Sequence, residues 1–240
     1  VEITQVKWTS DTHPLLSPND EWADFEIYSL RVGTSLPSEP SGSYVREALR
    51  NGLMLESKGV ANPYEFGLVG ASDTHVAATS DDEKTFFSKV GLLDADGELR
   101  GSVPVNPVFG LFARFMAPDT LTEVGGRTYT TGGGFESWSA SGITGVWAEE
   151  NTREAIYAAF KRKETYATSG PRIRLQIFGG WKFPDKTEKS PYFAKIAIQY
   201  GVPMGGDLAV NDNSQKAPIF LMRAVKDPVE ANLDRLQIVK

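Results

Sequence analysis

Strand-like and helix-like patterns of apolar and polar residues follow one another along the first 70 residues of the chain. Residues 1–8 (VEITQVKW) are rich in β-branched residues and predict a mostly buried strand. Residues 15–26 (LLSPNDEWADFE) have Ser and Pro at the start and acidic residues in the first turn, which predicts a short helix. Apolar residues at helical spacing predict a second helix, capped by Ser43 and ending near Gly52. A short apolar run over residues 66–69 predicts another strand.

Regular patterns return near residue 143 and continue to the last residue. Residues 143–147 predict a strand, and the segment after it predicts the most clearly patterned helix of the chain. This helix starts at Asn151, with Glu154 three places on as in a capping box, continues with an apolar stripe and closes with basic residues. Further along, alternating or apolar runs predict strands over residues 172–177, 194–199, 217–225 and 233–240.

These patterns predict an α/β fold followed by a β-rich region. The α/β part covers residues 1–170, and residues 79–141 within it lack strong periodicity, which predicts a long loop insertion, a lid or a binding loop. Residues 171–240 predict a small sandwich, or a sheet packed on the α/β part. We place the boundary between the two parts at the Gly170–Pro171 turn.

Composition excludes several classes of partner and chemistry. The net charge is −6 and the pI is about 5.1, whereas nucleic-acid-binding proteins carry basic surfaces, so we expect no nucleic-acid partner. No apolar run reaches the roughly 18 residues that a membrane span requires, so we expect no membrane partner. With no cysteine, the chain has no disulfide, thiolate ligand or cysteine nucleophile. The first residue is not Met and both ends read as strands, so we expect a piece of a longer protein.

The tetrapeptide Ser-Asp-Thr-His occurs twice and contains both histidines of the chain. The first SDTH copy holds Asp11 and His13, the second holds Asp73 and His75, and each follows a predicted strand. Residues i and i+2 of an extended segment point to the same side, so the carboxylate and the imidazole of one copy can converge on a cation. Zn, Mn and Fe accept such mixed ligands. A plain turn built on the Asp side chain explains the same letters, and both interpretations stay open at this stage.

Other segments give weaker signals. The segment YATSGPRI places Ser169 and Arg172 around a Gly-Pro turn, and they are candidate substrate-binding residues if that turn faces the site. The glycine run of TTGGGFESW lacks the strand, helix and Lys-Ser or Lys-Thr of a phosphate loop. No Gly-x-Ser-x-Gly elbow is present, so a serine triad is not supported.

The stretches LVGASDTHVAA and GVWAEENTREAIYAAFKRKETYATSGPRI resemble the DUF3604 family. HPLLSPNDEWADFE, SGSYVREALRNGL, GVPMGGDL and KDPVEANLDRLQIVK support the resemblance, which spans essentially the whole chain. These bacterial proteins are related to the PHP (polymerase and histidinol phosphatase) superfamily of metal-dependent hydrolases and are similar to carbaryl hydrolase-like enzymes. The resemblance implies a distorted β/α barrel and makes this chain the C-terminal portion of a longer protein, whose missing N-terminal part carries most of the metal ligands.

The resemblance also implies roles for individual residues. The superfamily closes its metal centre with an Asp-x-His after the last barrel strand, which assigns Asp73 and His75 as ligands of a divalent metal (Zn, Mn or Fe), with more than one ion in the full-length protein. Asp11 is assigned as a further ligand. His13 is assigned to the catalytic position, with its role as a ligand, substrate contact or supporting residue left open. The implied function is hydrolysis of a small-molecule ester or phosphoester by a metal-activated water.

The alternative is a non-catalytic fragment, or a binding or interdomain module, in which both tetrapeptides are structural turns. As an isolated chain, the 240 residues are expected to be inactive. The resemblance favours a periplasmic or exported location.

Overall fold

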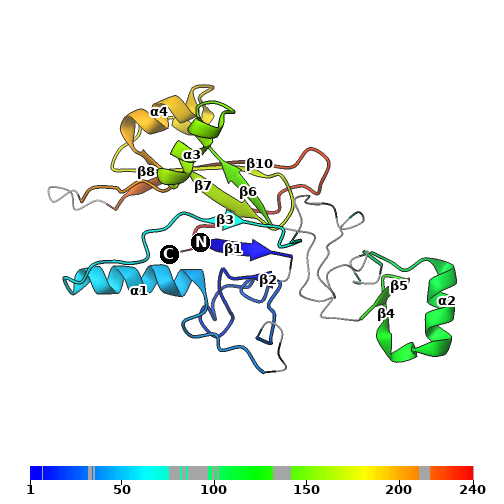
Figure 1. Ribbon diagram of the computed structural model, residues 1–240. Coiled ribbons are helices and arrows are strands. Elements are labelled where there is room, and N and C mark those ends of the chain that lie inside the picture. The colour runs from blue at the N-terminus through cyan, green and yellow to red at the C-terminus, as the bar shows by residue number, and fades with distance from the viewer. Residues whose placement is uncertain are drawn as a thin grey trace.

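A computed structural model describes residues 1–6, 8–31, 34, 36–75, 82, 85, 97–98, 101, 103–131, 142–210 and 217–239. The chain is a mixed α/β protein with several small sheets, and no sheet closes into a barrel within the described ranges (Figure 1). Its helices are α1 (Val45–Ser57), α2 (Pro107–Met116), α3 (Arg153–Lys161) and α4 (Phe193–Tyr200), with short 3-10 turns η2 (Pro118–Thr120) and η4 (Thr187–Lys189). Its strands are β1 (Glu2–Gln5), β2 (Trp8–Thr9), β3 (Val69–Gly70), β4 (Leu121–Val124), β5 (Arg127–Thr130), β6 (Ile143–Val146), β7 (Thr165–Thr168), β8 (Arg174–Gly180), β9 (Val202–Pro203) and β10 (Ile219–Val225).

The N-terminal sheet has the order β2-β1-β3. β3 runs parallel to β1, with Gly70 opposite Thr4, whereas β2 turns back and runs antiparallel, with Thr9 also opposite Thr4. The predicted strand over residues 1–8 is therefore a strand, a tight turn and a second short strand. This reversal decides where the two SDTH copies leave the sheet.

β3 and β6 lie side by side at a junction that only glycine fits. The amide of Gly142 donates to the carbonyl oxygen of Ala71, and the Thr144 hydroxyl donates to the carbonyl oxygen of Gly70. A Cβ on Gly70 would lie 2.7 Å from the carbonyl oxygen of Ile143, and a Cβ on Gly142 would lie 2.3 Å from the carbonyl oxygen of Thr4. Because both contacts are with backbone, a side chain at either position would push the strands apart.

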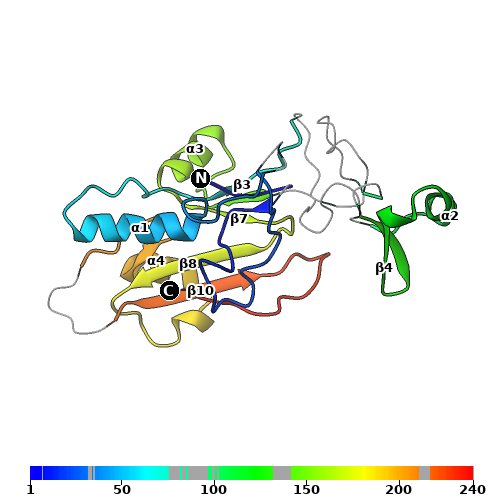
Figure 2. The same ribbon diagram turned by 90° about the horizontal axis from the view of Figure 1, so that it is seen from below.

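The C-terminal sheet has the order β10-β8-β9 and is covered by α4 (Figure 2). Phe178 of β8 packs edge-on against Phe193 of α4, with ring centroids 5.6 Å apart, and Ala197 completes this buried cluster. Phe183, Ala194 and Leu221 pack around it. This cluster is the hydrophobic core of the C-terminal sheet and fixes α4 on it.

Hydrogen bonds cross the Gly170–Pro171 turn at which we placed a boundary. The indole nitrogen of Trp147 donates to the carbonyl oxygen of Leu175, 2.8 Å away, and the Tyr166 hydroxyl donates to the carbonyl oxygen of Ile173. The β6-β7 pair is therefore joined to the start of β8. Both bonds are made by aromatic side chains whose polar ends find a partner when partly buried.

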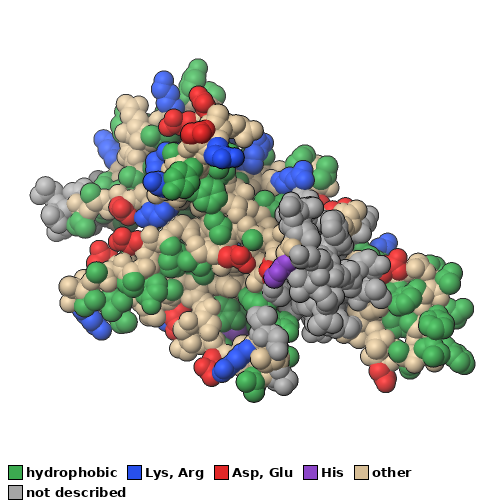
Figure 3. Space-filling model, in the orientation of Figure 1, with side chains coloured by type: hydrophobic (Ala, Val, Ile, Leu, Met, Phe, Trp, Pro, Cys, Tyr) green, Lys and Arg blue, Asp and Glu red, His purple; other side chains and the backbone are tan. Residues whose placement is uncertain are grey.

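α2 and the β4-β5 hairpin project from the rest of the chain (Figures 1 and 2). Asn106 caps the helix by accepting a hydrogen bond from the amide of Phe109. The outer side of α2 exposes a stripe of large apolar side chains, seen as green atoms at one end of Figure 3: Val108, Leu111, Phe112, Phe115 and Met116. This segment falls within the predicted loop insertion over residues 79–141, whose regular structure the sequence patterns did not predict. None of the helices among the described residues has the length and apolar character of a membrane span.

The prediction of a helix over residues 15–26 is wrong. This segment is a series of turns with hydrogen bonds from residue i+3 to residue i, such as the amide of Ala23 to the carbonyl oxygen of Asp20. The Asp20 side chain also accepts from the amide of Trp22, 3.1 Å away. Such local side-chain bonds compete with the helix for backbone donors, which explains why the acidic first turn does not start a helix.

Two predicted C-terminal strands are also wrong. Residues 193–200 form α4, because Phe193 and Ala197, four places apart, share the buried face, and a helix places such residues one above the other. Residues 233–239 have no regular structure and are exposed. The remaining major predictions are confirmed, since α1, α3, β8 and β10 occupy the expected segments. Their ends differ from the predictions: α1 continues past Gly52 to Ser57 and its N-cap is Tyr44 without a side-chain cap bond. The N-cap of α3 is Thr152 and not Asn151, because the Thr152 hydroxyl accepts from the amide of Ala155.

Candidate functional site

The two SDTH copies leave the N-terminal sheet at opposite ends. The second copy continues from the carboxyl end of β3. The first copy follows β2, which runs the other way, and the amide of Ser10 donates to the carbonyl oxygen of Ile3, near the start of β1. Along the strand direction, Asp11 and Asp73 are several residues apart, and each strand residue adds about 3.3 Å. This sheet therefore does not bring the two copies together.

The second copy brings its acid and its imidazole together. Nε2 of His75 lies 2.9 Å from Oδ1 of Asp73. Asp73 and His75 have φ of 51° and 56°, in the left-handed region that non-glycine residues rarely adopt, while Thr74 between them is 1% exposed. Two strained residues around a buried one are typical of segments whose geometry the surrounding structure imposes. The His75 side chain is half-exposed and so is accessible from solvent.

This geometry leaves one nitrogen of His75 available for chemistry. Because Nε2 faces the Asp73 carboxylate, the ring hydrogen belongs on Nε2 and Nδ1 keeps its lone pair. A carboxylate that holds one ring nitrogen is the usual support for a histidine that binds a metal or accepts a proton through the other. The residues of this copy therefore fit a cation in part: they offer one imidazole ligand, and Asp73, assigned as a second ligand, instead supports the other ring nitrogen.

Ser169 lies at the same edge of the structure as the second copy. β7 pairs antiparallel with β6, so that Thr168 at the end of β7 is opposite Ile143, and Ile143 in turn lies beside Gly70 of β3. The ends of β3 and β7 therefore meet at one edge, and the residue after β7 is Ser169. Ser169 is partly buried.

Arg172 belongs to a turn that is tied to the segment after β10. Its amide donates to Oδ2 of Asp227, 2.7 Å away, and its side chain is exposed. Amides of Val229 and Arg172 hydrogen-bond to the buried Asp227 carboxylate and hold its pKa below the usual value. The predicted substrate-binding role of Arg172 stays a prediction.

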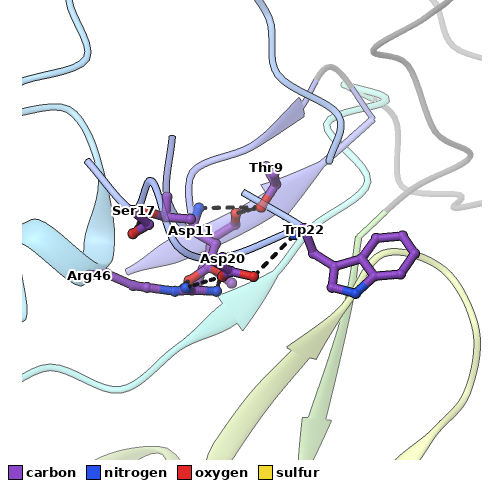
Figure 4. Close-up of polar contacts among 8 residues, drawn as sticks. Thr9, Asp11, Ser17, Asp20, Trp22 and Arg46 are labelled. Atoms are coloured by element: carbon purple, nitrogen blue, oxygen red, sulfur yellow. Dashed lines mark hydrogen bonds and ion pairs between the residues drawn. The ribbon is translucent and has the colours of Figure 1, made fainter. Parts of the chain in front are cut away.

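The carboxylate of the first copy is already paired. Arg46 of α1 donates from Nε to Oδ1 of Asp11 at 3.0 Å and from a terminal nitrogen to the other oxygen of the same carboxylate. Its remaining terminal nitrogen donates to Oδ2 of Asp20 at 2.6 Å. Figure 4 shows the Arg46 guanidinium between the two carboxylates, with the Trp22 ring turned away from them. Both oxygens of Asp11 thus serve an ion pair with Arg46.

The backbone of the first copy also holds the start of α1. The amides of Val45 and Arg46 donate to the carbonyl oxygens of Ser10 and Asp11. These are amides of the first helical turn, which have no partner within a helix. The hydrogen bond from Arg46, followed by that from the amide of Trp22, lowers the pKa of Asp20. Burial opposes the charge of Arg46, but its bonds to both carboxylates outweigh this effect and raise its pKa.

His13 makes a local contact rather than one with the second copy. Its Nδ1 accepts from the amide of Leu15, 3.1 Å away, and its ring lies tilted against Tyr44, with centroids 5.5 Å apart. Burial raises the pKa of Tyr44. A neutral imidazole has a single ring hydrogen, so an Nδ1 that accepts leaves that hydrogen on Nε2. Binding a metal through Nε2 would therefore require the bond to Leu15 to break.

Sequence reasoning missed Arg46 and Asp20, which form a three-residue ion network with Asp11. The two residues are 26 positions apart, and no local pattern connects them. Among the described residues, no group of three or more His, Cys, Asp and Glu side chains is placed to hold a metal ion. The second copy is therefore at most a partial metal site in these residues.

Comparison with known proteins gives one match. The model of a family described as "Protein of unknown function (DUF3604)" matches residues 1–240, which is the whole chain. No curated protein and no solved structure matches the chain.

Proposed function

We propose that this chain, which belongs to the DUF3604 family, contributes Asp73 and His75 to the divalent-metal site of a hydrolase. In this proposal the chain is the C-terminal portion of a longer protein related to the PHP superfamily. The missing N-terminal part supplies the other ligands and completes a distorted β/α barrel around β1, β3, β6 and β7. The substrate class is a small-molecule ester or phosphoester.

The single observation that carries the proposal is the Asp73–His75 pair. The pair lies just beyond the carboxyl end of β3, which is the end at which α/β folds place their sites. The left-handed backbone of both residues costs free energy, of order 1–3 kcal/mol for each such residue, and a surface turn without a function has no reason to keep two of them. Asp and His tolerate this conformation better than most residues, which accounts for their use here.

The chain's own residues would act in three ways. Asp73 orients the His75 ring and keeps its hydrogen on Nε2, so that Nδ1 faces outward as a ligand. The buried Thr74 holds the backbone between them, its hydroxyl 3.2 Å from that of Ser72. Ser169, at the same edge, would contact the substrate. A bound divalent cation would supply the chemistry, since it lowers the pKa of a coordinated water and stabilises the oxyanion of an ester.

A second candidate function is a non-catalytic packing or binding role, and the first SDTH copy favours it. Asp11 and His13 have the contacts of a structural turn: an ion pair with Arg46, a bond to the amide of Leu15 and backbone bonds to α1. If the second copy also served only as a turn, its replacement would change stability and leave metal content unchanged.

Metal analysis of the full-length protein separates the two candidates. We expect Asp73→Asn and His75→Gln to lower the affinity for Zn or Mn about 10- to 100-fold, measured by equilibrium dialysis and elemental analysis. Asp11→Asn and His13→Gln are matched controls, because they make the same changes in the same tetrapeptide. They should leave metal affinity within about twofold while Asp11→Asn lowers the melting temperature.

Two results would contradict the proposal. One is a metal content that none of the four substitutions changes. The other is rapid, metal-dependent phosphodiester hydrolysis by residues 1–240 alone, which would show that ligands from a missing N-terminal part are not needed.

A further inference from the structure

A cavity of about 490 Å³ lies between the β6-β7 pair and the C-terminal sheet. Trp147 and Glu149, just after β6, form one part of its wall, and Ile177 and Phe178 of β8 form another part. α4 contributes Ile198. The volume is within the range of roughly 300–1,000 Å³ typical of small-molecule sites.

This cavity is distinct from the Asp73–His75 site. β6 starts at Ile143, beside Gly70 of β3, and Trp147 follows its last residue. Four residues of strand place Trp147 roughly 13 Å from Ile143, at the other end of β6 from the second SDTH copy. A ligand in the cavity therefore does not occupy the proposed metal site.

The inner surface of the cavity is apolar and held in place. Phe178 is buried against Phe193, so this wall is continuous with the hydrophobic core. The Trp147 ring is fixed by the hydrogen bond from its indole nitrogen to Leu175, which leaves no polar group of the ring in need of a partner. Ile198, in contrast, is 59% exposed. An apolar ligand body would remove Ile198 and the Trp147 ring from water, which is energetically favourable.

The polar side chains of the lining carry an excess of negative charge. Arg162 is paired with Glu164, with Nε 2.9 Å and a terminal nitrogen 3.2 Å from the two carboxylate oxygens. The Glu164 charge is thereby neutralised, and both of its oxygens have donors. Glu149 is exposed and makes no ion pair within 4 Å in the part of the chain that the structure describes. The net formal charge of the lining side chains is thus that of one carboxylate. This negative charge would repel an anionic ligand.

We propose that this cavity binds a small molecule with an apolar, preferably aromatic, body and a protonated amine. The body packs between Trp147, Phe178 and Ile198, and the amine pairs with Glu149 at the rim. The amide of Gln176, which also lines the cavity, is a further hydrogen-bonding group for the head of the ligand. A cation near the indole face of Trp147 adds to this preference.

Three probes of equal length test the ligand class: 4-phenylbutylamine, 4-phenylbutanol and 4-phenylbutyrate. Their binding to the whole 240-residue chain is measured by calorimetry and by tryptophan fluorescence. We expect the amine to bind saturably with a dissociation constant below about 1 mM, several-fold tighter than the alcohol, with the acid weakest.

Substitutions in the lining locate the binding. Glu149→Gln should weaken the amine about three- to fivefold and leave the alcohol unchanged, because the lost interaction is an exposed charge pair. Glu150→Gln, at the neighbouring exposed residue that does not line the cavity, is the matched control and should have no effect. Ala194→Phe should abolish binding of all three probes by filling the cavity. Ile198→Ser, at an exposed position, should weaken all three about fivefold.

Circular dichroism melting curves confirm that each variant is folded. The absence of saturable binding of any probe at about 10 mM would overturn the proposal, as would amine binding that Glu149→Gln, Ala194→Phe and Ile198→Ser leave unchanged. Tighter binding of 4-phenylbutyrate than of the amine would overturn the assigned ligand class.

Discussion

The two SDTH copies show how one tetrapeptide can take two structures. In the first, Asp11 pairs with Arg46 of a distant helix and His13 accepts from a neighbouring amide, so each side chain faces a different partner. In the second, the acid and the imidazole face one another at 2.9 Å, on a backbone with two left-handed residues. Identical letters therefore do not specify identical geometry, because the partners come from outside the tetrapeptide.

The difference originates in the strands that precede the copies. β2 reverses the chain and leads Asp11 back toward the start of α1, where Arg46 binds it. β3 runs forward beside β6 and ends at a junction of backbone contacts around Gly70 and Gly142. The first copy thus holds the start of α1, whereas the His75 side chain of the second copy is half-exposed at an edge of the structure.

The largest expected effect is that of removing Arg46. Arg46→Met should lower the free energy of unfolding by about 2–4 kcal/mol, because two carboxylates lose their cation and Asp20 is only 7% exposed. Urea unfolding of the variant beside the parent chain measures the loss. His75→Gln is the comparison and should change stability by less than about 0.5 kcal/mol. Equal losses in the two variants would mean that the first copy is no more structural than the second.

Gly70→Ala tests the junction that positions the second copy. A Cβ at this residue would come within 2.7 Å of the carbonyl oxygen of Ile143, so the strands must shift. We expect a loss of about 1–3 kcal/mol in unfolding free energy, together with a change in the NMR signals of His75. The signals of His13 should stay in place. Changes confined to His13 would contradict the assignment of the junction to the second copy.

Lowering the pH should weaken the ion network of Arg46, Asp11 and Asp20, because acid protonates Asp20. The folded-state pKa of Asp20 lies below its unfolded value of about 3.9, so its contribution to stability is present above that pH. It is lost as the pH falls from about 3.9 through the lower folded-state pKa. Urea unfolding at several pH values between about 2 and 6 measures this decline. Asp20→Asn should make the decline shallower, and an identical pH profile in that variant would refute the contribution of Asp20.

The smallest expected effect is that of the His13 ring. His13→Ala removes an acceptor for the amide of Leu15 and a ring contact with Tyr44, both in a partly exposed region, and should lower stability by about 0.5–1 kcal/mol. Thermal melting detects such a change. His75→Ala is the counterpart, and a larger loss there than in His13→Ala would reverse the roles given to the two copies.

Part of this molecule was predictable because its signals are local. The capped amphipathic pattern around residues 151–161 predicted α3, and the apolar run over residues 217–225 predicted β10. Prediction failed where a distant group decided the local structure. Residues 193–200 alternate as a strand would, but Phe193 and Ala197 bury one helical face against β8. The sequence patterns did not predict α2, because its exposed side carries large apolar residues where a helix packed on a core carries polar ones.

The sequence by itself determined the chemical groups of this protein: two histidines, each two places after an aspartate, an acidic net charge and no cysteine. It also determined the family, since the model of the DUF3604 family, which the motifs resemble, matches residues 1–240. Only the tertiary structure decided which aspartate meets a histidine and which meets Arg46. The physical reason is that these partners are brought together by strand direction and by close backbone packing at Gly70, which depend on contacts between residues far apart in the chain.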